Sequence, residues 1–364
     1  MYIDNLKLRN FRNYQEASIE LKKGMNILMG ENGVGKTNLL EAIYFLSTTR
    51  SHRNVDDAEL ICFGEDFASL EASVVYQAEH DRLGVMLYKN GKTLMVKNTP
   101  VKRTSEFVGR INAVLFSPSD MDLFDTAPKA RRRLIDMELG KLSSLYMYEL
   151  SKYLKCLKER NTYLKTGSDP VMLETYTDML YEPQIKIITN RARFVSSLNA
   201  YLSYFYNQLA GTNSKLIITY ESFIKETSDE SVMAQQIKQA YAASANRDRF
   251  TQMTNIGIHR EDFTFYLDGK DVSKFASQGQ KRMVILSIKL AIVQIIFQIK
   301  REYPILLLDD VFSELDAKRR LGLLRLLPSS VQTVITTTDA QEVGLVRGQN
   351  VNVITIAKGK ILNG

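Results

Sequence analysis

Residues 30–37 read Gly30-Glu31-Asn32-Gly33-Val34-Gly35-Lys36-Thr37, the phosphate-loop pattern of two glycines that bracket four residues and precede lysine and threonine. The apolar run 25–29 before the loop predicts a strand, and the amphipathic run 38–46 after it predicts a helix. A strand, a glycine-rich loop and a helix in this order favour nucleotide binding. The alternative is a simple glycine turn between a strand and a helix.

The loop residues supply the groups that a nucleoside triphosphate requires. Glycines let successive backbone N–H groups point at phosphate oxygens, and the N-terminus of the following helix adds positive charge. Lys36 can reach the β- and γ-phosphates, and the Thr37 hydroxyl can ligate Mg²⁺. We therefore expect residues 30–37, together with Asn38, to contact the nucleotide.

The composition is that of a globular protein, with 364 residues of which 45% are hydrophobic and 24% charged. The two cysteines and three histidines have no metal-ligand spacing. The first residues lack the pattern of a signal peptide, and we expect no apolar run of membrane-spanning length. A cytoplasmic protein without a membrane partner is the expectation.

Positive charge is concentrated in one segment. The whole chain carries a net charge of +7, and residues 129–165 contain ten basic and four acidic residues. Such a stripe is typical of a surface that binds a phosphate backbone, although most charge runs are solvated helix faces. The candidate DNA contacts are Lys129, Arg131, Arg132, Arg133, Lys152, Lys155 and Lys158. The arginine run is equally compatible with bracing the joint between two domains.

Hydrophobic periodicity predicts an α/β protein with a helical insertion. Alternating segments before residue 120 predict strands, including an antiparallel set at the N-terminus, and helical patterns follow at 129–165 and 184–209. We expect a phosphate-loop head with a mixed sheet and flanking helices, built from residues 1–120 and 251–364. Residues 121–250 are predicted to form a helical arm.

A second half of the site follows the apolar run 305–308, which predicts a buried parallel strand. Asp309 and Asp310 come directly after it. In a phosphate-loop fold the first acid completes the Mg²⁺ shell with Thr37, and the second is the candidate base for the attacking water. An Asp-Asp turn that ends a core strand is the alternative.

Another anion-binding helix end is predicted at Ser277-Gln278-Gly279-Gln280, just before a long helical pattern. Because the phosphate loop already provides one such end, two subunits could close over each nucleotide, each offering residues 277–280 to the γ-phosphate of the other. The alternative is that Ser277 only caps the helix.

Taken together, these motifs resemble the ATP-binding-cassette ATPases of the structural-maintenance-of-chromosomes branch, and within it the bacterial recombination mediators. The resemblance covers essentially the whole chain. It rests on residues 10–14, 30–44, 50–53, 116–118, 131–136, 257–263, 275–280 and 308–316.

The resemblance implies ATP-driven homodimerisation, slow DNA-stimulated hydrolysis and binding to gapped DNA or single-strand/duplex junctions. It implies partnership with RecR and, through it, with RecO and RecA in recombinational repair. Lys36, Asp310, Ser277 and Gly279 match catalytic positions, and Arg12 lies where the N-terminal strand approaches the adenosine. The loop 313–316 matches the segment between the two nucleotides.

Two positions depart from transporter relatives within the same superfamily. Asp310 stands where they carry glutamate, which fits slow turnover. Residues 336–338 are all threonine, whereas the transporters have a histidine in this region. The sequence therefore does not identify the residue that senses the γ-phosphate.

Two other functions remain possible at this stage. The chain could be the nucleotide-binding subunit of a membrane transporter, but its insertion carries basic helices in place of a short coupling region. It could also be an ATP-dependent nuclease, but we find no further cluster of acids for cleavage.

Overall fold

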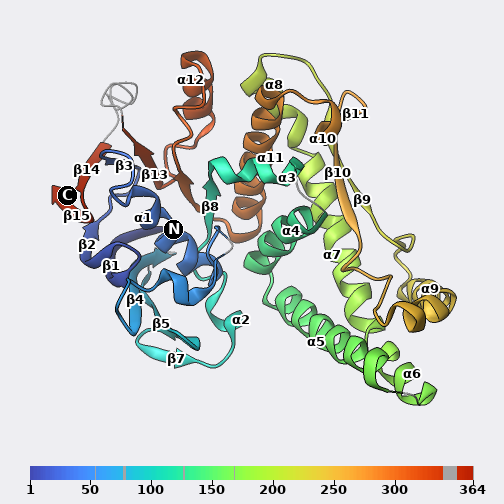
Figure 1. Ribbon diagram of the computed structural model, residues 1–364. Helices are drawn as coiled ribbons and strands as arrows, with labels where there is room; N and C mark the ends of the chain where they lie inside the picture. The colour runs from blue at the N-terminus through green and yellow to red at the C-terminus, as the bar shows by residue number, and fades with distance from the viewer. Residues whose placement is uncertain (54, 77–78, 126–127, 168, 339–350, 364) are drawn as a thin grey trace. The chain divides into compact units, whose positions relative to one another are not determined.

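The computed structural model describes residues 1–53, 55–76, 79–125, 128–167, 169–338 and 351–363. The chain forms two compact units, and Figure 1 labels their helices and strands. Unit 1 comprises Met1–Met121, Tyr204–Thr212 and Arg282–Gly364, and unit 2 comprises Asp122–Ser203 and Asn213–Lys281.

An antiparallel sheet in unit 1 is built from the N-terminal strands. It contains β1 (Tyr2–Phe11), β2 (Tyr14–Glu20), β4 (Phe67–Tyr76), β5 (Glu79–Tyr88), β6 (Gly91–Val96) and β7 (Thr99–Val101), in the order β2-β1-β4-β5-β6-β7. On β1, Leu6 and Leu8 are buried while Lys7 and Arg9 face solvent, as expected for a sheet with one wet face. This confirms the predicted antiparallel N-terminal strands.

The second sheet of unit 1 carries the phosphate loop. Its strands are β3 (Met25–Met29), β8 (Ala113–Phe116), β12 (Ile305–Leu308), β13 (Thr333–Thr337), β14 (Val351–Ala357) and β15 (Lys360–Asn363), in the order β15-β14-β3-β13-β12-β8. All neighbours are parallel except β14 and β15. Because β13 lies between β3 and β12, it separates the loop strand from the strand that ends at the two acids.

Helices and short helical turns complete unit 1. They are α1 (Lys36–Thr48), η1 (Asp57–Leu60), α2 (Thr104–Phe107), η2 (Pro118–Met121), most of α8 (Leu202–Ala210), α11 (Gln278–Lys300) from Arg282 onward, and α12 (Ala317–Leu326). The mixed sheet, its helices and the antiparallel strands confirm the predicted α/β class.

The expectation that no apolar run reaches membrane-spanning length is wrong for α11. By length and composition this helix could cross a membrane, but 72% of its most apolar window is buried inside the protein. A core helix that packs on several sides is apolar around most of its circumference, so it meets the same criteria.

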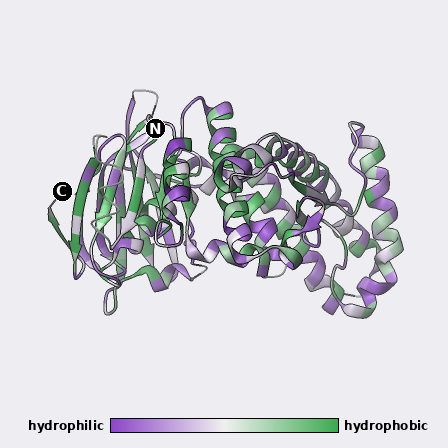
Figure 2. Ribbon diagram, turned by 90° about the horizontal axis from the view of Figure 1, so that it is seen from above, coloured by the Kyte–Doolittle hydropathy of each residue, from purple (hydrophilic) through white to green (hydrophobic). Residues whose placement is uncertain are grey.

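Unit 2 consists mainly of helices. Figure 2 shows that the helices of the chain carry both hydrophobic and hydrophilic residues. It contains α3 (Asp122–Asp125), α4 (Pro128–Leu142), α5 (Ser144–Thr166), α6 (Pro170–Asp178), α7 (Tyr181–Asn199), α9 (Glu230–Thr251) and α10 (Val272–Phe275). The pattern 129–165 predicted one helical stretch, but the chain breaks at Ser143, whose side chain caps α5 by accepting a hydrogen bond from the Tyr146 N–H.

A small antiparallel sheet changes the predicted domain boundary. Its strands are β9 (Leu216–Glu221), β10 (Asp262–Leu267) and β11 (Lys270–Asp271), in the order β11-β10-β9. Because β10 pairs with β9 along its whole length, residues 251–281 group with the helices and not with the head. Residues 204–212 group with unit 1.

Candidate functional site

Two glycines of the phosphate loop lie where a side chain would collide with neighbouring atoms. A Cβ on Gly30 would lie 2.3 Å from the carbonyl oxygen of Ile356 on β14. Gly35 caps α1 at a φ of 116°, and a Cβ there would lie 2.6 Å from Asn13 Nδ2 and 2.7 Å from the Tyr14 hydroxyl. Close contacts with β14 at Gly30 and with Asn13 and Tyr14 at Gly35 therefore hold the loop in its curved conformation.

Lys36 is the first residue of α1 and folds back into the loop. Its Nζ donates hydrogen bonds to the carbonyl oxygens of Gly30 and Glu31, at 2.6 and 2.7 Å. Burial lowers the pKa of this ammonium, while the charges of Asp310 and Asp309 act in the opposite direction. The Lys36 ammonium is thus held inside the loop and is attracted by the carboxylates of Asp310 and Asp309.

Asp309 follows β12, and its side chain is hydrogen-bonded to α1, the helix that follows the phosphate loop. Its Oδ1 accepts a hydrogen bond from Thr37 Oγ1 at 2.9 Å and another from Thr336 Oγ1 at 2.9 Å. Burial raises the pKa of the Asp309 carboxyl, and the two hydroxyls and Arg53 act against that rise. Residues far apart in sequence are thereby joined into one polar centre.

Asp310 is held by its backbone and leaves its side chain exposed. Its φ is 52°, in the left-handed region that non-glycine residues rarely occupy. Its N–H donates to Thr336 Oγ1 at 2.9 Å, and its carbonyl accepts from Ser313 Oγ at 2.8 Å. Two hydroxyl groups therefore stabilise the bend that turns the Asp310 carboxylate outward.

Thr336 is a site residue to which the sequence assigns no role of its own. In the sequence it is one of the three threonines 336–338, where transporter relatives carry a histidine. In the structure its side chain is buried and links the two acids, whereas Thr338 is exposed. The sequence alone gives no signal for this role, because it depends on β13 lying between β3 and β12.

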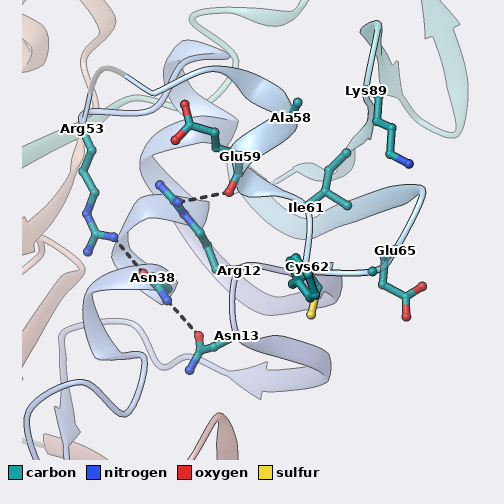
Figure 3. A pocket seen from close by; sticks show the side chains of 12 residues that line it. Arg12, Asn13, Asn38, Arg53, Ala58, Glu59, Ile61, Cys62, Glu65 and Lys89 are labelled. Carbon is teal, nitrogen blue, oxygen red and sulfur yellow. Dashed lines mark hydrogen bonds between the residues drawn. The ribbon is translucent and has the colours of Figure 1, made fainter.

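Arg12 sits beside the loop helix in a fixed position (Figure 3). Its guanidinium makes two hydrogen bonds of 2.9 Å to the carboxylate of Glu41 and one of 3.1 Å to the carbonyl of Glu59. Burial raises the pKa of Glu41, but hydrogen bonds from Arg12 and Ser51 and the charges of Arg12 and Arg53 leave that pKa below its usual value. Glu41 is therefore a buried anion that orients Arg12.

A hollow of about 630 Å³ opens around Arg12 and extends to Lys89. Two hydrogen bonds join residues that line it, as the dashed lines in Figure 3 mark. Asn38 donates to Asn13 Oδ1 at 2.8 Å, and Arg53 donates to Asn38 Oδ1 at 3.1 Å. Asn13 in turn donates to the Val34 carbonyl at 3.0 Å. The hollow thus adjoins the phosphate loop and offers cations and amide groups.

Residues 277–280 lie in unit 2 at the beginning of α11. The Ser277 N–H donates to Gln280 Oε1 at 2.9 Å, and the Gln280 N–H donates to Ser277 Oγ at 3.3 Å, a reciprocal capping box. Ser277, Gln278, Gly279 and Gln280 are all exposed, and no atom would lie within 4 Å of a Cβ on Gly279. Ser277 therefore caps its helix, and the helix end is open to a large anion.

Two of the candidate DNA contacts are engaged inside unit 2. Arg131 makes two hydrogen bonds of 2.8 Å to the carboxylate of Asp262 on β10. Arg132 donates to the carbonyl oxygen of Glu261 at 2.5 Å. A guanidinium that donates from two nitrogens to one carboxylate has those donors occupied and its charge balanced by its partner.

The remaining candidates differ in exposure. Arg133 is half-buried, and Lys152 is half-buried with an ion pair of 3.2 Å to Glu182. The exposed ones are Lys129 on α4 and Lys155 and Lys158 on α5. Lys155 forms a long ion pair of 4.0 Å with Glu159, and its side chain stays exposed to solvent.

The family model of the RecF/RecN/SMC N-terminal domain matches residues 2–361. The chain is 42% identical over 349 residues to the DNA replication and repair protein RecF of Lactobacillus johnsonii, covering 94% of this chain and 93% of that protein. It is 40% identical over 362 residues to RecF of Streptococcus pneumoniae, covering 99% and 98%.

Solved structures agree with these relatives. A structure of the recombination mediator protein RecF with ATP, in the RecFOR pathway, matches with a TM-score of 0.91 at 31% identity and covers 100% of this chain and 97% of that one. An Smc head bound to the C-terminal winged-helix domain of ScpA matches with a TM-score of 0.58 at 15% identity, covering 100% and 98%, and supports the fold alone.

Proposed function

Because the chain belongs to the RecF/RecN/SMC N-terminal domain family, and within it to the RecF proteins, which are ABC-type ATPases of DNA replication and repair, we propose that it is an ATP-gated DNA clamp. ATP closes two copies of the chain on DNA, and slow hydrolysis releases them. The protein acts in the cytoplasm at gapped DNA and single-strand/duplex junctions.

The observation that carries this proposal is the hydrogen bond between Thr37 and Asp309. It joins the end of the phosphate loop to the acid after β12 across 272 positions of sequence. A glycine turn or an Asp-Asp turn alone would not require this pairing. Together with Lys36 in the loop, it forms the phosphate and metal half of an ATP site.

The residues present fit ATP. The curve of residues 30–35 is fixed by the contacts at Gly30 and Gly35, and Lys36 lies within it as a point charge for the β- and γ-phosphates. The adjoining hollow has the size of a ligand pocket and places the Arg12 guanidinium where an adenine ring could stack. RecF with bound ATP provides the matching fold.

The donor set also fits Mg²⁺, a hard cation that prefers hydroxyl and carboxylate oxygens. Thr37 and Asp309 would hold it, and bound Mg²⁺ would neutralise charge on the β- and γ-phosphates. Thr336 orients the Asp309 carboxylate through its 2.9 Å hydrogen bond. Asp310, with an exposed carboxylate, accepts the proton of the attacking water.

Thr336→Val removes the hydroxyl that links both acids and keeps the side chain close to its original size. We expect Mg²⁺-supported binding of a fluorescent ATP analogue to weaken by about tenfold to a hundredfold, as for other groups that orient a metal ligand. Binding without metal stays unchanged. Thr338→Val, at an exposed neighbour, is the control. Equal Mg²⁺ dependence in Thr336→Val and the unmodified protein would contradict this role for Thr336.

The other half of the site comes from a second copy. Ser277 and Gly279, at the open N-terminus of α11, bind the γ-phosphate held by the partner copy, and residues 313–316 lie between the two nucleotides. The exposure of residues 277–280 supports this proposal, because a helix end without a buried neighbour is available to an anion.

DNA contacts are assigned to the exposed lysines Lys129, Lys155 and Lys158 and not to Arg131 and Arg132. We expect Lys155→Glu/Lys158→Glu to weaken binding to gapped duplex by about tenfold or more and to lower its salt slope, since phosphate contacts release counterions. ATP affinity stays unchanged.

Gel-shift titrations at several salt concentrations measure this effect. Lys22→Glu/Lys23→Glu is the matched control, with the same charge change at exposed residues of unit 1. If both double variants bind gapped DNA as tightly as the unmodified protein, the α5 face is excluded. If the unmodified protein binds no DNA at any salt concentration, the clamp itself is excluded and a transporter subunit is favoured.

Partners follow from the same proposal. RecF is placed in the RecFOR pathway by the matched structures. We assign RecR as the direct partner of this chain, with RecO and RecA engaged through it.

A further inference from the structure

The C-terminal end of α9 presents an aromatic ring and cations to solvent. Its last residues include Arg247, Arg249 and Phe250, all exposed, with Phe250 at 90% of its possible surface. Asp248 between them points inward and is completely buried in an ion pair of 2.9 Å with Arg160. The exposed side of this helix end therefore carries positive charge without a matching carboxylate.

The chain after α9 continues this surface toward α5. Both the N–H and the hydroxyl of Thr254 donate to Asn161 Oδ1 on α5, at 2.8 and 2.7 Å. Lys158 and Lys165 lie three residues before and four residues after Asn161, on the same face of the helix, and both are exposed. The segment that follows Phe250 is thus flanked by two lysines.

A fifth cation, Arg260, contacts the segment that follows α9. Arg260 donates from Nη2 to Met253 Sδ at 3.6 Å, and the Met253 side chain is 43% exposed. We call this surface the α9-end patch. It consists of Lys158, Lys165, Arg247, Arg249, Phe250, Met253 and Arg260.

The cations of the patch differ from other cations of unit 2 in having no ion pair within the described part of the chain. Among the residues that the structure describes, none of the five has a carboxylate within ion-pair distance, whereas Arg131, Lys152 and Lys186 are each paired with one. Cations at a helix C-terminus also interact favourably with the helix dipole, which accounts for Arg247 and Arg249 in part. The dipole does not account for an almost fully exposed phenylalanine.

An exposed aromatic ring among unpaired cations is the arrangement that binds single-stranded nucleic acid. Bases stack on the ring whatever their identity, and the cations contact the phosphates on either side. A duplex offers phosphates but keeps its bases stacked inside. A surface with an exposed ring is therefore expected to favour unpaired bases over a duplex.

We propose that the α9-end patch binds the single-stranded part of gapped DNA, with one base stacked on Phe250. This assignment rests on the proposed DNA-clamp function and adds to it a site for the unpaired strand. Lys158 belongs to both the α5 face and the patch, so the phosphate backbone runs from one to the other. Phe250 distinguishes the patch from a purely electrostatic surface.

The experiment compares Phe250→Ala and Phe250→Tyr in the full chain with ATP. The probes are an oligonucleotide of single-stranded DNA, a gapped duplex with 2-aminopurine in its gap, and a blunt duplex of the same length. We expect Phe250→Ala to bind the first two about tenfold more weakly, to leave blunt-duplex affinity unchanged and to lose the quenching of 2-aminopurine. Phe250→Tyr retains affinity and quenching. Tyr204→Ala is the control, because Tyr204 is a 57% exposed aromatic residue of unit 1.

The possible results separate the patch from the clamp. Unchanged binding of gapped DNA by Phe250→Ala overturns the patch and leaves the clamp intact. An equal loss for blunt duplex and single strand overturns base stacking at Phe250. If the unmodified protein binds none of the three probes, the clamp and the patch are both overturned.

Discussion

Replacing Lys36 by alanine is expected to lower ATP affinity about a hundredfold and to remove ATP-dependent dimers. The ammonium is already held inside the loop by the carbonyls of Gly30 and Glu31, so it is positioned for the phosphates before they arrive. A loss of about 3 kcal/mol of charge-assisted hydrogen bonding corresponds to that factor in the dissociation constant. Calorimetric titration with ATP and light scattering measure the two effects.

The fold should survive the Lys36→Ala substitution. Burial lowers the pKa of Lys36, so the folded protein gains little from keeping this charge in place. Lys22→Ala, which removes an exposed lysine of unit 1, is the control. A Lys36→Ala variant that binds ATP as tightly as Lys22→Ala would show that the loop does not hold the nucleotide through this side chain.

Replacing Asp310 by asparagine is expected to have the opposite effect on dimers. ATP still binds, hydrolysis slows by about a hundredfold to ten-thousandfold because the base is lost, and closed dimers accumulate. Asparagine tolerates the left-handed backbone that Asp310 adopts, and the hydrogen bonds from Thr336 and Ser313 reach only its backbone. The local structure is therefore retained while the carboxylate is removed.

Phosphate release and dimer lifetime measure the outcome for Asp310→Asn. Asp268→Asn is the control, at an exposed acid of unit 2 that also has a positive φ, of 49°. Hydrolysis at the unmodified rate in Asp310→Asn would exclude Asp310 as the base.

The sequence predicted the strand, the loop and the helix around residues 30–37 because these elements are adjacent in the chain. Residues 25–46 contain the strand, the loop and the helix together, so periodicity and glycine spacing are sufficient. The strand before Asp309 and Asp310 was also predictable, since a continuous apolar run is typical of a buried parallel strand.

The parts that the sequence did not predict depend on which distant segments become neighbours. Thr336 links the acids only because β13 separates β3 from β12. The sequence left Arg131 and Arg132 open between DNA contact and bracing a joint, and the fold brings Asp262 and the Glu261 carbonyl to them. Pairing of β10 with β9 likewise moved the domain boundary. Periodicity contains no information on such pairings.

The most direct test of ATP-driven closure is the molar mass of the unmodified protein and of Asp310→Asn under saturating ATP and Mg²⁺. Light scattering after size-exclusion chromatography gives both masses, with nucleotide-free protein as the reference. A composite site formed by two copies predicts a monomer without ATP, a dimer with ATP and a longer-lived dimer for Asp310→Asn. A monomer for both proteins under saturating ATP would contradict it.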